Sequence, residues 1–494
     1  MTSSHHCKQA KDLLVTNSSF NQDAMTDKQI IKALLEENKM LKALVAKLEQ
    51  RVSELEKRLG LDSSNSSKPP SSDGFKKPPT ISLRSSEKFY GGQAGHLGKT
   101  LELVANPDEI KVHKVQRCHQ CQSDLSDVDV ERMIKRQVFD IEIKRVVTEH
   151  QAEVKRCKCG ACTTANFPEG IKAPAQIGDT LRSFALYLSG QFIAKDRLSM
   201  AMKDLFGVPI SDTTLIKYET QLSENLSPLY QQTLERIQSN AVKHQDESGL
   251  RVGGKTGWIQ VLSTKLLTYL WYDPKRKSLI EVGEGICVHD HYKPYLQQKG
   301  VEHAFCNAHH LRELKALKLY EQEEWASEMY SLLRIMLQST QHEIPISSEK
   351  IEFLQRAYDK VVQHGFDYHE SLAPPLSLKK SPRGRKKRRT GHNLLWRLKT
   401  HKKDVLRFLS DRRVPFTNNQ AEQDLRMVKL KQKISGCLRT VAGARDFAII
   451  RSFIGTVRKN KLNVLDSIKL ALHNKFDLAD ILPFEYPQQL LLPC

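Results

Sequence analysis

The sequence predicts a multidomain α/β protein. The chain has 494 residues, more than one hydrophobic core usually organises, so we expect roughly three or four folded units. Strand-like runs bounded by Gly, Pro or charged turns begin after Ala241, and helical patterns follow them. A long apolar heptad pattern and a cysteine-rich segment precede this part. We therefore expect an α/β core with smaller modules ahead of it.

The first expected module is a coiled coil over residues 27–60 that joins two copies of the chain. Apolar residues recur at alternating steps of three and four over residues 31–59, with leucine at every second position. The alternate positions carry β-branched residues and the polar Asn38, which is typical of a parallel two-stranded coil whose asparagine fixes the register. A solvated helix packed on its own domain is the alternative.

Residues 61–100 are rich in Ser, Pro, Gly and Lys. Such a composition buries too little apolar surface to order itself, so we expect a disordered linker. Residues 101–170 contain short alternating runs such as QVFDIEI between two cysteine clusters. These runs predict a small β module.

The cysteine clusters predict that this β module is zinc-ribbon-like. Two-residue spacings let paired thiolates meet one tetrahedral Zn²⁺. The first cluster supplies two ligands, and the second offers three candidates for two places, between which the sequence does not choose. The five candidates are Cys118, Cys121, Cys157, Cys159 and Cys162. Unligated buried cysteines are the alternative.

Residues 171–240 are predicted to form a helical DNA-binding region. An apolar-periodic segment ends at Phe206 and Gly207, and Ser211 is a plausible N-cap for a second helix. This is the outline of a helix-turn-helix. An ordinary helical hairpin has the same spacing, because the motif contains no specific chemical residue.

Three acidic residues form a candidate metal site. Asp246 follows a predicted strand, Asp290 ends another, and Glu422 lies just inside a predicted helix. Carboxylates at the ends of neighbouring strands converge, and a helical glutamate can complete an oxygen cage for Mg²⁺ or Mn²⁺. Two such ions would serve phosphoryl transfer. Taken singly, each acid is more often a helix cap or a surface charge.

Four stretches, three of which contain these acids, resemble blocks of the insertion-sequence-sixty-six family of bacterial transposases. They are DESGLRV, VHDHYKPY, FCNAHHLREL and VPFTNNQAEQDLRMVKLKQKISGCLRT. NSSKPPSSD and NFPEGIKAPAQIG resemble that family too, so the resemblance is collinear over nearly the whole chain. It implies an RNase H-like core with an Asp-Asp-Glu triad at Asp246, Asp290 and Glu422. The implied activity is that of a polynucleotidyl transferase, which cleaves at insertion-sequence ends and transfers the strands into target DNA.

The resemblance also divides the second half of the chain. Asp290 and Glu422 are 132 residues apart, more than a minimal RNase H-like core requires, which predicts a helical insertion with a basic loop. The expected segments are 241–312 for the first part of the core, 313–410 for the insertion, 411–475 for the catalytic helix and the rest of the core, and 476–494 for a tail.

Basic residues after Glu422 are candidates for DNA contact. Arg426 and Lys429 lie four and seven positions further on, so on a helix they share its face and can grip phosphates beside the scissile bond. The resemblance implies that a basic residue seven after the glutamate contacts the DNA end. Lys433, one turn later, is assigned to the same group. An ion pair between Glu422 and Arg426 is the alternative.

Four neighbouring residues are given supporting roles. Asn418 and Asn419 are expected to cap the helix that carries the glutamate. His309 and His310 lie close to Cys306 in sequence, but the spacing suits a metal poorly. We therefore predict that the two histidines are structural.

Charge and composition indicate the partner. The formal net charge is +20, which favours a polyanion such as DNA. We expect double-stranded DNA as partner, both terminal inverted repeats and target, with a homodimer and accessory element-encoded proteins. The N-terminus has no signal-like apolar region, and no stretch of about 20 apolar residues occurs, so we expect a cytoplasmic protein. The resemblance implies that it is bacterial and nucleoid-associated. The rival hypothesis is a non-catalytic dimeric zinc-containing DNA-binding regulator, for which the three acids would be scattered.

The basic loop yields the first testable prediction. Residues 371–413 contain 15 Lys or Arg against two acids, and the DNA-binding candidates there are Arg383, Arg385, Lys386, Lys387 and Arg388. Replacing these five with Gln should flatten the salt dependence of DNA binding, because each lost phosphate contact removes about 0.9 from the logarithmic slope. Anisotropy titrations over a range of salt concentrations measure that slope. An unchanged slope would show that the loop does not contact phosphate.

Overall fold

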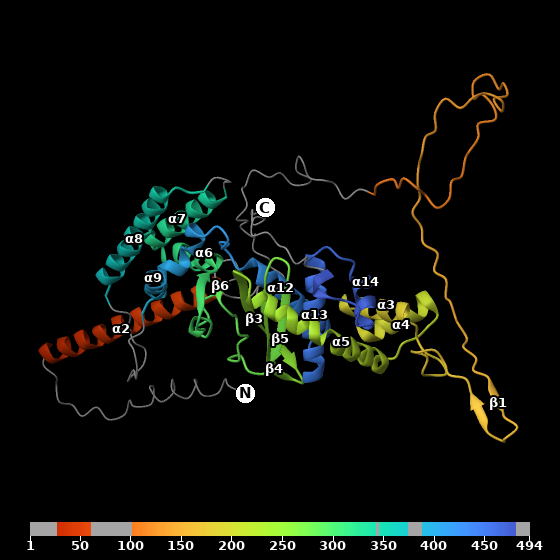
Figure 1. The fold of residues 1–494 in the computed structure, drawn as a ribbon. Coiled ribbons are helices and arrows are strands. Elements are labelled where there is room, and N and C mark those ends of the chain that lie inside the picture. The colour runs from red at the N-terminus through yellow and green to blue at the C-terminus, as the bar shows by residue number, and fades with distance from the viewer. Residues whose placement is uncertain (1–26, 61–100, 342–344, 374–387, 481–494) are drawn as a thin grey trace. The chain divides into compact units, whose positions relative to one another are not determined.

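The structure is a computed structural model that describes residues 27–60, 101–341, 345–373 and 388–480 (Figure 1). The chain divides into two compact units, of which the first contains helix α2 and Arg312–Glu323 and the second contains the sheet and the remaining helices. The predicted linker over residues 61–100 lies outside the described residues. So do Arg383, Arg385, Lys386 and Lys387 of the basic loop.

Helix α2 spans Asp27–Gly60 as one uninterrupted helix of 34 residues. Its heptad stripe is open to solvent in the single chain: Leu34 and Leu48 are 57% and 56% exposed. A continuous apolar stripe of this length is unfavourable in water unless another surface covers it. The exposed stripe is therefore compatible with the predicted coiled coil, which remains a prediction.

We expect a peptide of residues 27–60 to form a parallel dimer at micromolar concentration, because leucines on the stripe would pack into each other across two chains. Leu41→Lys places a charge on the stripe and should give a monomer. Met40→Lys is the matched control, because Met40 is also exposed but lies off the stripe. Sedimentation equilibrium measures the mass, and a monomeric parent peptide would contradict the prediction.

The segment over residues 101–177 contains less β structure than its sequence predicts. Strands β1 (Val154–Arg156) and β2 (Cys162–Thr164) form one short antiparallel hairpin. The alternating run over residues 137–143 was expected to be a strand, and that prediction is wrong, since the described chain has no strand there. Val138 within it is 92% exposed, so the run neither pairs with a neighbour nor buries its apolar face.

The next segment is helical, as predicted, and consists of three helices, with a break at Phe206 and Gly207 where the sequence indicates one. Their bounds are Asp179–Gly190 for α3, Lys195–Phe206 for α4 and Asp212–Gln238 for α5. Helix α4 ends at Gly207, whose φ of 67° is left-handed and therefore suits glycine. Ser211 caps α5 by accepting a hydrogen bond from the Thr214 amide at 3.1 Å. Binding of DNA by this region remains a prediction.

A five-stranded mixed sheet forms the centre of the second unit. The strands are β3 (Val242–Val252), β4 (Lys255–Ser263), β5 (Thr268–Asp273), β6 (Gly285–His289) and β7 (Val301–Phe305). Their order is β5-β4-β3-β6-β7. The first three are antiparallel, while β6 is parallel to both β3 and β7. Gly253 and Gly254 connect β3 to β4 with φ of 55° and 77°, as a tight hairpin turn with two left-handed residues requires.

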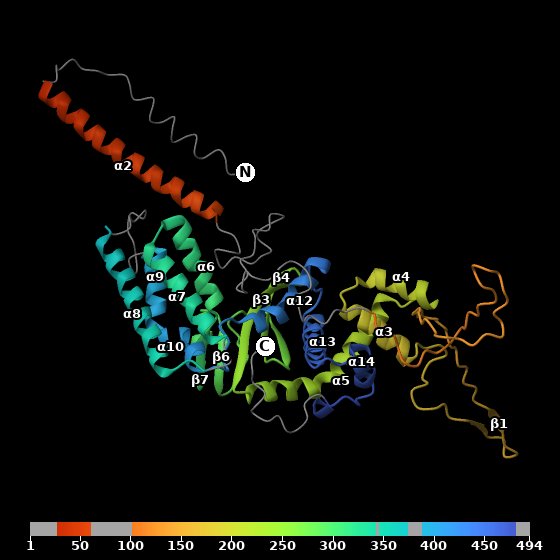
Figure 2. The same cartoon turned by 90° about the horizontal axis from the view of Figure 1, so that it is seen from above.

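Helices cover both faces of the sheet (Figure 2). Helices α12 (Asn419–Ser435) and α13 (Val441–Lys459) pack on one face, where Leu250 and Ile259 share a core with Leu425. Helix α5 packs on the other face, where Leu262 shares a core with Ile237. Successive side chains of a strand point to opposite faces. The even-numbered residues of β3 therefore face α12.

Further helices lie between β7 and α12 in the chain, where the sequence predicts an insertion. Their bounds are Asn307–Ala316 for α6, Glu324–Thr340 for α7, Ser348–Ser371 for α8, Thr390–Thr400 for α9, Lys402–Val405 for α10 and Arg407–Ser410 for α11. The short helices are Tyr295–Gln297, Leu317–Glu321 and Leu478–Asp480, and α14 (Val464–Leu472) follows α13. Within the described ranges, no helix is long and apolar enough to cross a membrane.

Candidate functional site

The register of two central strands brings Asp246 and Asp290 together. Strands β3 and β6 are parallel, with His244 opposite Val288. Two residues further along both strands, Asp246 comes opposite Asp290, which directly follows β6. Asp246 was expected to follow its strand, and that expectation is wrong, because β3 continues through Asp246 to Val252. Asp246 is even-numbered and therefore faces α12.

Asn418 places Glu422 over the same strands. Its side-chain Nδ2 donates to the carbonyl of Gln245 at 2.8 Å, and its Oδ1 lies 2.9 Å from Nδ1 of His244. Its backbone amide donates to Sγ of Cys306 at 3.1 Å. These bonds attach the start of α12 to β3, and Glu422 lies in the first turn of that helix.

The predicted capping role of Asn418 and Asn419 is wrong in its chemistry. Asn418 occupies the N-cap position, but its side chain makes no cap hydrogen bond to α12. The side chain cannot cap the helix because its oxygen and nitrogen both bond to β3. Asn419 is the first residue of the helix and is exposed.

The carboxylates of the acidic site repel one another. Burial, and then the negative charge of Asp290, raise the pKa of Asp246 well above its usual range. Smaller contributions to this pKa come from Glu247 and Glu422. Repelling carboxylates of this kind are satisfied by a divalent cation, and Mg²⁺ and Mn²⁺ prefer such oxygen ligands. The donor set therefore fits the metal that the sequence predicts.

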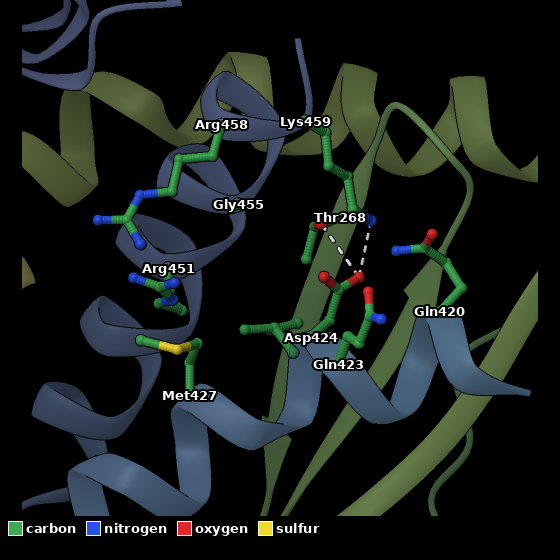
Figure 3. A pocket seen from close by; sticks show the side chains of 10 residues that line it. Thr268, Gln420, Gln423, Asp424, Met427, Arg451, Gly455, Arg458 and Lys459 are labelled. Carbon is green, nitrogen blue, oxygen red and sulfur yellow. Dashed lines mark hydrogen bonds and ion pairs between the residues drawn. The ribbon is translucent and has the colours of Figure 1, made fainter. Parts of the chain in front are cut away.

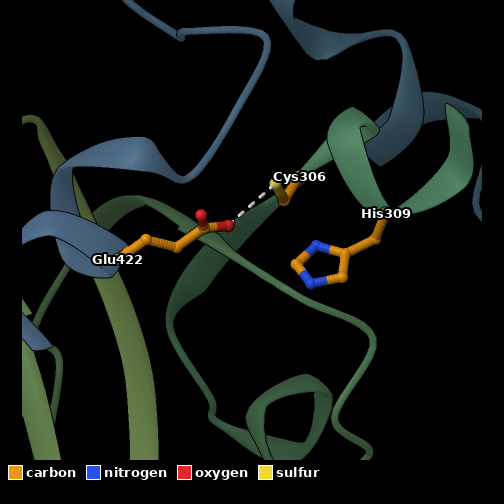
Figure 4. A group of neighbouring side chains, drawn as sticks. All are labelled: Cys306, His309 and Glu422. Atoms are coloured by element: carbon orange, nitrogen blue, oxygen red, sulfur yellow. Dashed lines mark hydrogen bonds between the residues drawn. The ribbon is translucent and has the colours of Figure 1, made fainter. Parts of the chain in front are cut away.

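Glu422 also approaches a second set of ligand atoms. Those of Cys306, His309 and Glu422 all lie within 4.8 Å of one another, with Sγ of Cys306 4.0 Å from Oε1 of Glu422 (Figure 4). In the part of the chain that the structure describes, this is the one group of three or more metal-ligating side chains that are so close. The ligand atoms of Asp246, Asp290 and Glu422 are therefore not all within 4.8 Å of one another, although the three residues share a site. Sulfur and imidazole ligands suit zinc rather than magnesium.

The two adjacent histidines have different surroundings, although the sequence analysis assigned both a structural role. His310 is buried, with Nδ1 2.8 Å from Oδ1 of Asn307 and Nε2 2.6 Å from Nε2 of His291. These contacts are those of a structural residue. His309 instead lies beside Cys306 and Glu422 (Figure 4).

Sequence reasoning missed a supporting cluster around Glu247. This side chain is 5% exposed and accepts hydrogen bonds from Arg276 Nε at 3.0 Å and Arg276 Nη2 at 2.6 Å, and from the hydroxyl of Tyr295. The guanidinium of Arg276 also lies over the ring of Tyr292, at 4.2 Å from its centroid. The amide of Tyr292 donates to Asp290 Oδ1 at 2.8 Å. The cluster therefore holds the loop that begins at Asp290.

The basic residues of α12 differ in exposure. Lys429 is half-buried, and its Nζ donates to the carbonyl of Gly249 at 3.4 Å. Burial lowers the pKa of Lys429, and the charge of Asp246 opposes that change. Arg426 and Lys433 are exposed. Among the described ion pairs none joins Glu422 to Arg426, so the alternative reading of Arg426 is not supported.

Arg388 is the one DNA-binding candidate of the basic loop within the described residues. Its guanidinium lies over the ring of Trp396, 4.7 Å from the centroid. This contact places Arg388 against helix α9. DNA contact by Arg388 remains a prediction.

Both cysteine clusters form tight turns. In the first, the Gln122 amide donates to the carbonyl of Cys118 at 3.0 Å, and in the second the Gly160 amide donates to that of Cys157 at 2.9 Å. A hydrogen bond with the side chain of Ser123 is the main cause that lowers the pKa of Cys121 to about 7, which favours the thiolate that binds metal. Among the described residues no three of the five cysteines converge within 4.8 Å, so zinc binding remains a prediction.

Comparison with known families identifies the class of protein. The Transposase IS66 family matches residues 178–446, which include the whole sheet and all three acids. A family of unknown function, DUF6444, matches residues 20–102. A search of curated proteins gave no match.

The matched region defines a transposase, an enzyme that acts on DNA. The match covers more than half of the chain, and the chain belongs to the IS66 family of transposases.

We expect the purified full-length chain to contain zinc bound through the two cysteine clusters. Substituting Cys118 and Cys121 together with Ser should remove it, because a tetrahedral site cannot close with two ligands. Cys306→Ser tests whether zinc is held beside Glu422 instead, and Cys437→Ser is the control because Cys437 is exposed and outside both clusters. Elemental analysis gives the zinc content. A zinc-free parent, or loss of zinc only in Cys306→Ser, would contradict the assignment.

Proposed function

We propose that this transposase cleaves DNA at insertion-sequence ends and transfers the strands to target DNA, using Asp246, Asp290 and Glu422 as ligands of two Mg²⁺ or Mn²⁺ ions. The observation that carries the proposal is the placement of the three acids at one site. Asp246 lies opposite Asp290 by strand register, and the charges of both Asp290 and Glu422 raise its pKa. Scattered acids, as a non-catalytic regulator would have, do not influence each other in this way.

The sheet supports an RNase H-like core. Three antiparallel strands are followed by two parallel ones in the order β5-β4-β3-β6-β7, and helices cover both faces (Figure 2). An RNase H-like core has this order and these directions, with acids on the first and fourth strands. Asp246 lies on β3 and Asp290 follows β6. In order along the chain, these are the first and fourth strands of the five-stranded sheet.

The chemistry follows from the positions of these side chains. Bound ions would activate a water or a 3′-hydroxyl and stabilise the leaving oxygen. The chain itself supplies the three carboxylates, and the reaction needs no covalent intermediate with the protein. Lys429 lies on the same face of α12 as Glu422 and next to Asp246, where it can bind a phosphate beside the scissile bond. Arg426 is exposed on that face and can extend the contact.

The other modules complete the proposal. Helix α2 would pair two copies of the chain, and the cysteine clusters would hold one Zn²⁺. Helices α3, α4 and α5 would contribute to recognition of the terminal inverted repeats. Each of these roles rests on the sequence patterns described above and has its own test.

Amide substitution of any of the three acids should abolish cleavage while leaving the fold intact. Metal ions supply several kcal/mol of transition-state stabilisation, so Asp246→Asn, Asp290→Asn and Glu422→Gln should each slow strand cleavage by about 10²-fold or more. The melting temperature without metal should stay equal or rise, because each change relieves repulsion between carboxylates. Cleavage of a duplex carrying the element's ends, with Mg²⁺ or Mn²⁺, gives the rate.

Glu352→Gln is the matched control, because it removes the same charge at an exposed position on α8, outside the acidic site. Its rate should equal that of the parent. Full cleavage activity in any one of the three site variants would refute that residue as a metal ligand. A large drop in melting temperature would instead indicate a structural ion pair, because deleting one partner strands the other.

A further inference from the structure

A pocket of about 310 Å³ opens between α12, α13 and β5 (Figure 3). Its walls come from Gln423 and Asp424 on α12, Thr268 on β5, and a row of basic residues on α13. Gly455 makes the close packing of α13 on β5 possible, since an added Cβ would lie 3.0 Å from the Thr268 side chain. The pocket is not part of the acidic site.

The pocket walls carry more positive than negative charge. Three cations line it, Arg451, Arg458 and Lys459, against the single carboxylate of Asp424. Lys459 and Asp424 neutralise each other through an ion pair of 2.7 Å, and Thr268 donates to the same carboxylate oxygen at 3.1 Å (Figure 3). Neither arginine forms an ion pair with a carboxylate of the walls among the described contacts, and Arg458 donates from Nη2 to Oε1 of Gln191 at 2.8 Å.

Arg451 is a buried cation whose surroundings favour binding of an anion. Its side chain is 6% exposed, and its buried Nη1 has no hydrogen-bond partner. Burial, and then the positive charge of Arg458, lower its pKa to about 10. The guanidinium lies 5.5 Å from the ring centroid of Phe192, which compensates only part of the lost hydration. A buried cation with unused donors is costly unless an anion completes it.

The pocket and the acidic site lie on different sides of α12. Gln423, Asp424 and Met427 line the pocket, whereas Glu422 and Lys429 belong to the side that faces Asp246. A helix is about 10 Å across, so the pocket cannot hold the scissile phosphate. A phosphate bound in the pocket is therefore a different one from the phosphate that is cut.

We propose that this pocket binds a backbone phosphate of the DNA, with Arg451 and Arg458 as its donors. This phosphate is not the one that is cut, so the contact would fix the register of the DNA relative to the three acids. Arginine suits this role because its planar fork of donors matches phosphate oxygens. The inference rests on the proposed function only in taking DNA as the substrate.

Binding measured without metal separates this inference from cleavage. We would titrate Arg451→Gln and Arg458→Gln with a duplex of about 40 base pairs in EDTA and follow the salt dependence of the binding constant. Loss of one phosphate contact should reduce the logarithmic slope by about one. Arg236→Gln is the matched control, because Arg236 is an exposed arginine on α5, on the other face of the sheet, and should leave the slope unchanged.

Thermal melting without DNA tests the alternative of a structural arginine. Arg451→Met should melt at the same or a higher temperature than the parent, because it removes an unpaired buried charge. If Arg451 were structural, Arg451→Met would lower the melting temperature. Should Arg451→Gln not fold, the Arg458→Gln variant decides the question, since Arg458 is the second donor of the pocket.

The outcomes are distinct. Reduced slopes in both arginine variants, with an unchanged control, support the phosphate pocket even if the parent does not cleave DNA. Unchanged slopes overturn it even if the parent cleaves. Inorganic phosphate is the second probe: if it stabilises the parent against melting but not Arg451→Gln, while the DNA slopes are unchanged, the pocket binds free anions and the assignment to DNA is wrong.

Discussion

The attachment of α12 to β3 through Asn418 is the contact on which the acidic site depends. Two hydrogen bonds of this side chain, one accepted from His244 and one donated to the carbonyl of Gln245, attach the first turn of the helix to the strand. Burial lowers the pKa of His244 to about 4, so the ring is neutral at physiological pH, and its bond to Asn418 Oδ1 requires the tautomer with the proton on Nδ1. Together with the core that Leu425 shares with Leu250, this attachment fixes Glu422 relative to Asp246, although the two acids are 176 positions apart in sequence.

Helix α12 separates two regions of unbalanced charge. On one side, burial and the neighbouring carboxylates raise the pKa of Asp246. On the other side, Arg451 is buried beside Arg458. Each arrangement costs stability in the isolated chain and is relieved by a ligand of opposite charge. A divalent metal on the acidic side and a phosphate on the basic side would relieve both, which is how a single helix would hold DNA relative to the catalytic ions.

Local features of the fold were predictable from sequence, whereas contacts between distant segments were not. The end of α4 at Gly207 and the cap at Ser211 depend only on neighbouring residues, so the sequence located both. Asp290 and Glu422 were found because one follows a strand and the other begins a helix, and the resemblance singled out all three acids. Asp246 was expected at the end of a strand but lies within β3. The roles of the three acids as metal ligands remain a proposal. The side-chain partners of Asn418 lie over 170 residues away, and no local pattern indicates them. The pocket around Arg451 joins β5, α12 and α13 and was missed for the same reason.

The most direct test of the catalytic site is to locate manganese in crystals of the full-length protein soaked with Mn²⁺. Anomalous diffraction identifies the metal positions independently of activity. The account predicts manganese bound between Asp246 and Asp290, with Glu422 turned toward it and away from Cys306. Manganese bound by Cys306, His309 and Glu422 without either aspartate, or absent from the site at concentrations that support cleavage, would contradict it.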